Sequence, residues 1–297
     1  MNISLAYTST PLTELQSDFL NKSGVRLLVK REDLNHPLVS GNKWWKLKYN
    51  LEEALWQKHN TLLTFGGAYS NHIYAMAAAA KELGLKSIAI IRGEEVLPLN
   101  HTLAFAESCG MKLYYVSREA YRHKTEEEFI QKLCDQFGDF YLIPEGGTNE
   151  LAVRGVAEFA ATLIHEVDFD YLCLPIGTGG TMAGIVRGMK GSKNILGFSV
   201  LKGGAFLNDE VKKWAGDSFN NWSIVEDYHF GGYAKVTDAL ISFMKEIAVQ
   251  HQLPLDQVYT SKMLFGILDL IKKDFFKKGS TILMLHTGGL QGNRIIS

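Results

Sequence analysis

The stretch 61-TLLTFGGAYSNHIYAMAAAAKELG-84 joins a short apolar run to an alanine-rich segment through a glycine-containing turn. A short apolar run bounded by a turn is typical of a buried strand. Alanine has the highest helix propensity, so residues 71–84 favour a helix, and Gly84 is a suitable residue to end it. We therefore predict a strand and a helix in succession, the unit from which parallel sheets are built.

The same alternation continues along the chain in two sets. The first set continues with apolar runs at 87–93, 112–117 and 140–147, and the second has them at 170–177, 194–203, 222–227 and 280–289. Helical patterns interleave with the second set around 150–166, 181–190, 235–251 and 261–277. Strands that alternate with helices imply parallel sheets covered on both faces. The predicted fold class is therefore α/β, with two open, twisted parallel-sheet domains.

The length of the chain agrees with two domains, since 297 residues at roughly 100–200 residues per domain leave room for both. No proline- or serine-rich linker separates the two sets. We therefore expect two lobes that meet along a shared cleft, where small molecules usually bind.

The charge balance disfavours nucleic acid and membrane partners. Lys and Arg number 31 against 32 Asp and Glu, so no long-range field attracts polyanions. Residues 1–15 lack the pattern of a secretory signal, and no window approaches the ~20 apolar residues of a membrane helix. The three cysteines form no CxxC pair, which suits a reducing cytoplasm. The predicted partner is a small molecule.

Metal and serine-hydrolase chemistry find little support in the motifs. The nine histidines show no HExxH or paired spacing that would hold zinc, and no serine sits in a GxSxG turn. We predict no metal site.

A glycine-rich segment, 177-GTGGTMAG-184, follows one predicted strand and opens a helix. Glycines let the backbone approach an anion closely, and the start of a helix offers N–H groups to a phosphate. The predicted phosphate site consists of Gly177, Thr178, Gly179, Gly180 and Thr181. Its spacing matches neither the dinucleotide GxGxxG motif nor a P-loop. Taken alone, such a segment is more often a tight turn without a ligand.

The turn 66-GGAYSNH-72 places Ser70 where a helix N-cap belongs, ahead of Asn71. Backbone amides and a hydroxyl then converge at a strand end, which suits a substrate carboxylate. An ordinary helix cap is the simpler interpretation of this turn by itself.

Lys43 lies in 40-SGNKWWKLKYNL-51, at the predicted start of a helix. A positive charge there opposes the helix dipole, and burial beside Trp44 and Trp45 would lower the pKa of the amine and favour Schiff-base formation. Lys46 and Lys48 lie close in sequence, so a solvated basic face is the commoner explanation for this lysine-rich segment.

Together, these segments resemble one family of enzymes. The matching segments are 30-KREDLNHPLVSGNKWWKLKYNL-51, 66-GGAYSNH-72, 177-GTGGTMAG-184, 258-VYTSK-262 and 286-HTGG-289, in the order of the family and over nearly the whole chain. They resemble the 1-aminocyclopropane-1-carboxylate deaminase and D-cysteine desulfhydrase family. That family consists of pyridoxal 5'-phosphate (PLP) enzymes with the tryptophan synthase β-subunit fold, also called fold type II.

The resemblance implies a role for each matched residue. Lys43 would form the Schiff base with PLP and later act as base or acid at the substrate carbon. Asn71 would bond the phenolic oxygen of the cofactor and also contact substrate, and Ser70 would hold substrate and take part in catalysis. The further implied site residues are the catalytic tyrosines Tyr259 and Tyr233, the cofactor-binding Thr260, and the substrate-binding His72 and Thr287.

The resemblance also implies a domain division and an assembly. Residues 1–48 with 150–297 would form the larger, PLP-binding domain, and residues 49–149 a smaller α/β domain with the carboxylate loop. A cytoplasmic homodimer that acts on a small amino acid is expected.

Thr260 and Thr287 point to one branch of the family. Deaminases of the cyclopropane acid typically carry glutamate and leucine at these positions, whereas the D-cysteine branch resembles this chain. A hydroxyl opposite the pyridine nitrogen makes a weaker electron sink than a carboxylate, which suffices for β-elimination. The expected reaction is α-proton abstraction by Lys43, loss of sulfide, and hydrolysis to pyruvate and ammonia.

Three alternatives remain open at this stage: cyclopropane-acid deamination to 2-oxobutanoate and ammonia, a β-replacing reaction that builds cysteine, and PLP binding without turnover. The chain also departs from the family pattern at Tyr69 and in the short region 207–222, whose role is not assigned.

Overall fold

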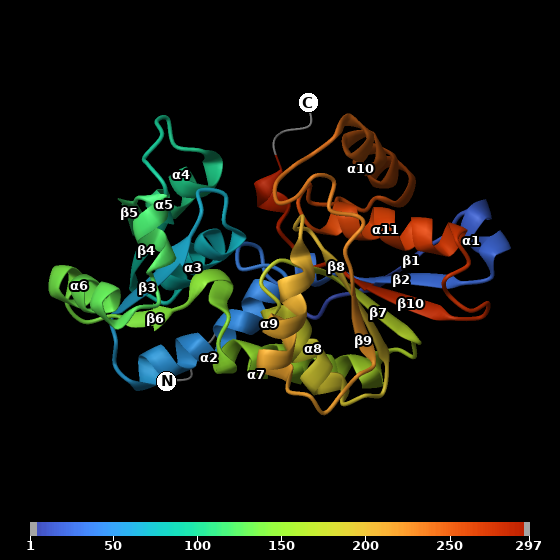
Figure 1. Cartoon of the computed structure of the whole chain (residues 1–297), viewed down its shortest axis with the longest axis horizontal. Coiled ribbons are helices and arrows are strands. Elements are labelled where there is room, and N and C mark those ends of the chain that lie inside the picture. The colour runs from blue at the N-terminus through green and yellow to red at the C-terminus, as the bar shows by residue number, and fades with distance from the viewer. Residues whose placement is uncertain (1–4, 294–297) are drawn as a thin grey trace.

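The computed structural model describes residues 5–293 and divides them between two sheets in separate lobes (Figure 1). The larger sheet has the order β1-β2-β10-β7-β8-β9, and the smaller has the order β5-β4-β3-β6. The larger-sheet strands are β1 Leu12–Leu15, β2 Arg26–Lys30, β7 Tyr171–Ile176, β8 Asn194–Ser199, β9 Trp222–Val225 and β10 Thr281–Leu285. The smaller-sheet strands are β3 Thr61–Gly66, β4 Lys86–Arg92, β5 Met111–Val116 and β6 Tyr141–Ile143.

Parallel pairing dominates both sheets, so the α/β fold class predicted above is confirmed. The exception is β1, which pairs antiparallel to β2 at the edge of the larger sheet. The expectation of a wholly parallel second sheet was wrong at this edge, because two short strands near the N-terminus were not recognised. Residues 26-RLLVK-30 offer only a brief apolar run between charged residues.

Helices connect the strands and cover both sheets. They are α1 Asp18–Ser23, α2 Asn42–Trp56, α3 Asn71–Glu82, α4 His101–Ser108, α5 Arg118–Arg122, α6 Glu127–Phe137, α7 Glu150–Glu166, α8 Gly180–Met189, α9 Leu207–Ala215, α10 Asp238–His251 and α11 Thr260–Lys272. The helix predicted from 71 ends as expected, since Gly84 adopts a positive φ of 68° just after α3. None of the helices between residues 5 and 293 is long and apolar enough to cross a membrane.

One hydrophobic core continues from one lobe to the other. It includes Leu62 and Ile73 of the smaller lobe, Leu47 of α2, and Ile185 and Leu283 of the larger lobe. Because α2 contributes to this core, the helix that begins beside Lys43 is fixed against both lobes.

Small residues let α2, α7 and α8 pack closely. A Cβ on Gly155 of α7 would lie 2.1 Å from the carbonyl oxygen of Trp45, and one on Gly188 of α8 would lie 2.3 Å from that of Ala157. Through α7, these contacts fix the position of α2 relative to α8. The N-terminal ends of α2 and α8 both line the candidate site.

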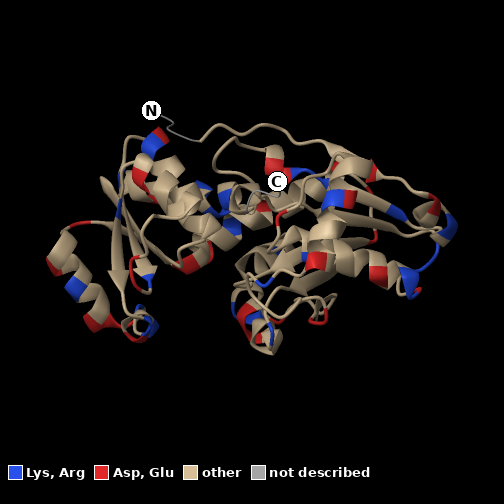
Figure 2. Ribbon diagram, turned by 90° about the horizontal axis from the view of Figure 1, so that it is seen from above, with Lys and Arg blue, Asp and Glu red and all other residues tan. Residues whose placement is uncertain are grey.

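Basic and acidic residues are interspersed along the ribbon of both lobes (Figure 2), in keeping with a net charge of -1.

Candidate active site

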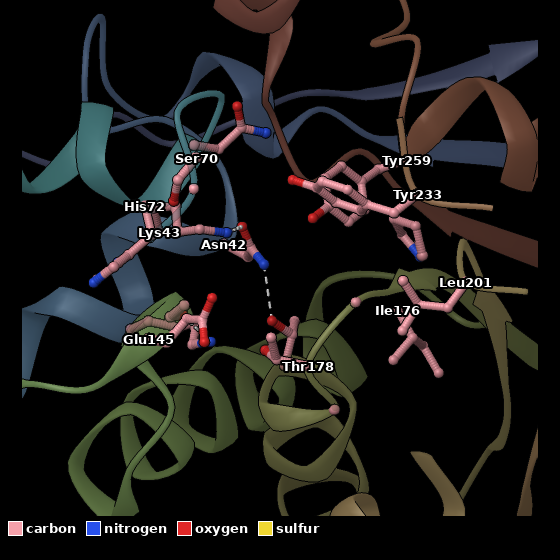
Figure 3. Close-up of a pocket in the computed structure, with 18 of the residues that line it drawn as sticks. Asn42, Lys43, Ser70, His72, Glu145, Ile176, Thr178, Leu201, Tyr233 and Tyr259 are labelled. Atoms are coloured by element: carbon pink, nitrogen blue, oxygen red, sulfur yellow. Dashed lines mark hydrogen bonds between the residues drawn. The ribbon is translucent and has the colours of Figure 1, made fainter. Parts of the chain in front are cut away.

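A cavity of about 780 Å³ lies between the two lobes, at the carboxyl ends of strands from both sheets. Ligands in open parallel sheets bind at this end of the strands. The predicted site residues that line it are Lys43, Ser70, Asn71, His72, Gly177, Thr178, Gly179, Thr181, Tyr233, Tyr259 and Thr287. Gly180 and Thr260 are not among its lining residues, although each directly follows one that is. Figure 3 shows Lys43, Ser70 and His72 on one side of the cavity and the two tyrosines on the other.

The turn at Gly41, which hydrogen bonds hold in place, positions Lys43. Gly41 adopts a φ of 70°, and a Cβ there would lie 2.0 Å from the carbonyl oxygen of Thr287, so only glycine fits. The Gly41 N–H donates to the Glu32 carbonyl at 2.9 Å, and the Asn35 side chain donates to the Gly41 carbonyl at 3.0 Å. The turn therefore starts α2 with Lys43 in its first turn, facing the cavity.

The Lys43 amine donates a hydrogen bond to Asn42 Oδ1 at 3.0 Å. Burial lowers the pKa of Lys43 to about 8, and the nearby Asp256 carboxylate opposes this shift. Trp44 and Trp45 do not line the cavity but pack against Tyr7. A larger share of neutral amine at neutral pH is what a nucleophilic lysine needs.

The expectation that Lys46 belongs to a solvated basic face was wrong. Lys46 is only 2% exposed and lines the same cavity, where its amine donates to the Gly146 carbonyl and to Thr148 Oγ1. Burial, followed by the charge of Lys43, lowers its pKa well below the ordinary lysine value. Lys48, in contrast, pairs with Glu158 at 2.8 Å outside the cavity. The spacing of three residues that puts Lys43 and Lys46 on one helix face was the available signal for Lys46.

The start of α8 has free N–H groups at the cavity. Its N-cap, Gly179, has a φ of 78° and provides no side-chain cap. Thr178 Oγ1 lies 3.1 Å from Thr148 Oγ1, which in turn accepts from Lys46. Asn42 Nδ2 donates to Thr181 Oγ1 at 2.8 Å, linking this segment to α2. An uncapped helix start with adjacent hydroxyls and a buried amine fits the phosphate of PLP.

The turn after β3 carries the predicted substrate loop. Ser70 is the N-cap of α3, and its Oγ accepts from Ile73 N at 3.3 Å, so the hydroxyl proton remains available to another acceptor. Asn71 Oδ1 accepts from Gln291 Nε2 at 3.0 Å, which ties the loop to the larger lobe. Tyr69, half-exposed beside His101, also lines the cavity.

His72 is a buried acceptor in the cavity wall. Thr64 Oγ1 donates to the Ile143 carbonyl at 2.7 Å, so it accepts from His72 Nε2 at 3.0 Å. This leaves Nδ1 as the unprotonated nitrogen, buried and without a hydrogen-bond partner in the described chain. Burial and the two lysines lower the pKa of His72 well below its ordinary value, so the ring is neutral.

Tyr233 and Tyr259 form a ring pair, with centroids 6.2 Å apart and planes at 72°. Burial raises the pKa of both hydroxyls, so both stay protonated at neutral pH. Tyr259 sits at the start of α11, where the buried Asp256 carboxylate accepts from Tyr259 N at 2.9 Å and from Thr260 N at 2.7 Å. Asp256 was not singled out from the sequence, because no motif marks it.

The two branch-determining threonines occupy different environments. Thr260 is fully buried, and its hydroxyl donates to Asp256 Oδ1 at 2.8 Å, so its proton is already engaged. Thr287 lines the cavity, and its carbonyl oxygen abuts Gly41.

Charged residues outside the recognised motifs line the smaller-lobe side of the cavity. Arg92 is the last residue of β4, and Lys124 pairs with Glu145 at 3.3 Å. The unassigned region 207–222 also reaches the site, since Glu210 of α9 lines the cavity. None of these residues lies in a recognisable motif.

The chain matches the model of the family described as pyridoxal-phosphate dependent enzyme over residues 3–288. A Thermotoga maritima protein, provisionally named 1-aminocyclopropane-1-carboxylate deaminase, is 32% identical over 98% of this chain and 97% of its own. The mitochondrial Arabidopsis thaliana protein named bifunctional D-cysteine desulfhydrase/1-aminocyclopropane-1-carboxylate deaminase is 31% identical over 97% of this chain and 78% of its own. A solved structure described as an ACC deaminase homologue superposes with a TM-score of 0.83 at 27% identity, covering 98% of this chain and 92% of that chain.

Proposed function

Because the chain belongs to the pyridoxal-phosphate dependent enzymes, in the family of 1-aminocyclopropane-1-carboxylate deaminase and D-cysteine desulfhydrase, we propose that it converts D-cysteine and water to pyruvate, sulfide and ammonia. The observation that carries the proposal is the convergence of Lys43, the open start of α8 and the Ser70 loop on one cavity. PLP, when bound, supplies the electron sink that stabilises negative charge at the substrate α-carbon.

The proposed roles of the side chains follow from their surroundings. Lys43 holds the cofactor covalently and then moves the α-proton, which its lowered pKa of about 8 permits near neutral pH. Lys46 and the N–H groups at the start of α8 hold the phosphate. The Ser70 hydroxyl and the amides of its loop hold the substrate carboxylate.

The remaining proposed contacts involve both lobes. Asn71 bonds the phenolic oxygen of the cofactor, and the neutral His72 and Thr287 contact substrate. The hydroxyls of Tyr233 and Tyr259, which remain protonated, donate to the departing sulfur or to substrate oxygen. Thr260, whose hydroxyl donates to Asp256 Oδ1 and accepts from Asp256 N, presents a neutral group and not a carboxylate to the cofactor nitrogen, which keeps the electron sink weak.

We also propose the division into a cofactor-binding domain, residues 1–48 with 150–297, and a smaller domain, residues 49–149. The two sheets support it, since strands of the smaller sheet lie between Thr61 and Ile143. The boundary at residue 48 falls within α2, and the outermost residues of the larger domain lie outside the described range. A cytoplasmic homodimer completes the proposal, and light scattering of the purified protein would measure its mass.

The cyclopropane acid is the second candidate substrate, supported by the names of the relatives. Purified protein loaded with PLP should be assayed with D-cysteine for pyruvate and sulfide, and with the cyclopropane acid for 2-oxobutanoate. We expect turnover of D-cysteine. Turnover of the cyclopropane acid alone would reverse the assignment, and cysteine formation that requires added sulfide would indicate a β-replacing enzyme.

Lys43→Ala separates catalysis from simple binding. The variant should lose the absorbance band of lysine-bound PLP and all turnover. A band that persists unchanged in Lys43→Ala would contradict the central assignment.

A further inference from the structure

The loop that carries Tyr233 has an irregular backbone. Four of its residues have positive φ, namely 52° at Phe230, 91° at Gly231, 117° at Gly232 and 56° at Ala234. Two of these four are not glycine, and such conformations persist only where the surrounding structure holds them. Something must therefore hold this loop in place for Tyr233 to keep its position on the cavity wall.

Lys262 provides such an anchor from α11. It is only 1% exposed, and its amine donates to the His229 carbonyl at 2.9 Å and to the Gly232 carbonyl at 2.8 Å. No carboxylate lies within ion-pair distance of it among the described residues. A buried amine is costly unless it is hydrogen-bonded, so both carbonyl contacts are needed to retain it.

The position of Lys262 along the helix couples two elements of the site. It follows Tyr259 by three residues, so one short stretch at the start of α11 holds one tyrosine directly and the loop of the other through hydrogen bonds. The loop also has hydrogen bonds of its own: Gly231 N donates to His229 Nδ1 at 2.9 Å, Gly232 N to the His229 carbonyl at 3.0 Å and Lys235 N to the Gly232 carbonyl at 3.2 Å. Lys262 therefore donates to the carbonyls of the first and last residues of the turn from His229 to Gly232.

We propose that Lys262 is a positioning residue for Tyr233: it holds the carbonyls of His229 and Gly232 so that the Tyr233 ring stays against Tyr259 in the cavity. The consequence for turnover rests on the proposed function, whereas the consequence for the loop does not. Phe230 also contacts Phe265 of α11, with ring centroids 5.0 Å apart, so the loop keeps one apolar contact when Lys262 is replaced.

Hydrogen exchange tests the loop without the reaction. In Lys262→Met, peptides covering 229–235 should exchange faster by about tenfold or more, while peptides of α3 stay unchanged. Lys245→Met, at an exposed lysine of α10, is the matched control and should leave both regions unchanged. Unchanged exchange at 229–235 in folded Lys262→Met would overturn the proposal, even if the protein turns over neither candidate substrate.

Kinetics test the link to Tyr233, with whichever substrate the wild-type protein turns over. Lys262→Met should retain the absorbance band of bound PLP but lose kcat by about tenfold or more, and adding Lys262→Met to Tyr233→Phe should cause little further loss. Should Lys262→Met not fold, Lys262→Gln keeps a two-proton donor and should show smaller changes of the same kind. Fully additive losses in kcat would show that Lys262 does not act through Tyr233.

Discussion

At the scale of single residues, the two lysines that line the cavity have different hydrogen-bond partners. Lys43 bonds only a side-chain amide oxygen, whereas Lys46 is fixed by Gly146 and Thr148. Burial, followed by the charge of Lys43, lowers the pKa of Lys46, so the pKa values do not separate the two roles. The hydrogen bonds separate them: Lys43 is the amine that is free to react, whereas Lys46 is held in place, and an anion bound beside it would favour its charged form.

The pH dependence of cofactor capture tests this difference. Only a neutral amine attacks an aldehyde, so with a pKa of about 8 the rate of PLP capture by cofactor-free protein should rise with pH to a midpoint near 8. An ordinary lysine, with a pKa of about 10.4, would give a midpoint two pH units higher. Stopped-flow absorbance measures the rate. Asp256→Asn should lower the midpoint further, because that carboxylate favours the charged amine; a midpoint near 10 in both proteins would contradict the assignment.

Motifs located the residues whose position is set by a local turn, and they missed those that reach the site through tertiary packing. Lys43 and Ser70 each follow a glycine-containing turn at a strand or helix end, so local sequence was enough to find them. Lys46 was misjudged and Asp256 was overlooked, because burial and distant partners decide their roles. Spacing along the chain shows which residues share a helix face, as Lys43 and Lys46 do, but it does not show whether the other lobe covers that face.

At the scale of elements, the packing of α2, α7 and α8 positions the two ends of the predicted cofactor site. The alternation of apolar runs identified most strands, since the inner strands β3, β4, β7 and β8 are buried over most of their length. It missed β1 and β2, where the run is short, and helices such as α6, in which a few apolar residues, among them Leu133 and Phe129, pack against the smaller sheet and alternate with charged ones.

Gly188→Ala tests the α7–α8 contact, because the contact and helix propensity predict opposite changes in the free energy of unfolding. Helix propensity alone would favour alanine by about 1 kcal/mol. However, the added Cβ would lie 2.3 Å from the Ala157 carbonyl oxygen and 2.5 Å from Ala160 Cβ. We therefore expect the free energy of unfolding to fall by about 1–3 kcal/mol, measured by urea denaturation. Ala161→Gly, at an exposed site of α7, calibrates the propensity term; a more stable Gly188→Ala protein would show that the helices are not in this contact.

At the scale of the whole molecule, the cavity joins lobes that already share one core. Asn71 of the smaller lobe bonds Gln291 of the larger, and Asn42 bonds Thr181 across the site. A ligand that contacts Lys43, the start of α8 and the Ser70 loop together would add a further connection between the lobes. Its binding should therefore stabilise the molecule as a unit and not one lobe alone.

Removal of PLP should lower the melting temperature of the whole protein in one transition. At a ligand concentration about 100 times Kd, binding contributes about 2.7 kcal/mol, which corresponds to a shift of roughly 4 °C in a protein of 297 residues. Pyridoxal without its phosphate should raise the melting temperature far less, because the start of α8 and Lys46 then have no anion to hold. Lys46→Met should reduce the shift caused by PLP, whereas Lys48→Met, on the outer side of α2, should not. Calorimetry of the wild-type protein, Lys46→Met and Lys48→Met, each with PLP, with pyridoxal and without ligand, measures these shifts. Equal stabilisation of the wild-type protein by PLP and pyridoxal would place the phosphate outside the predicted site.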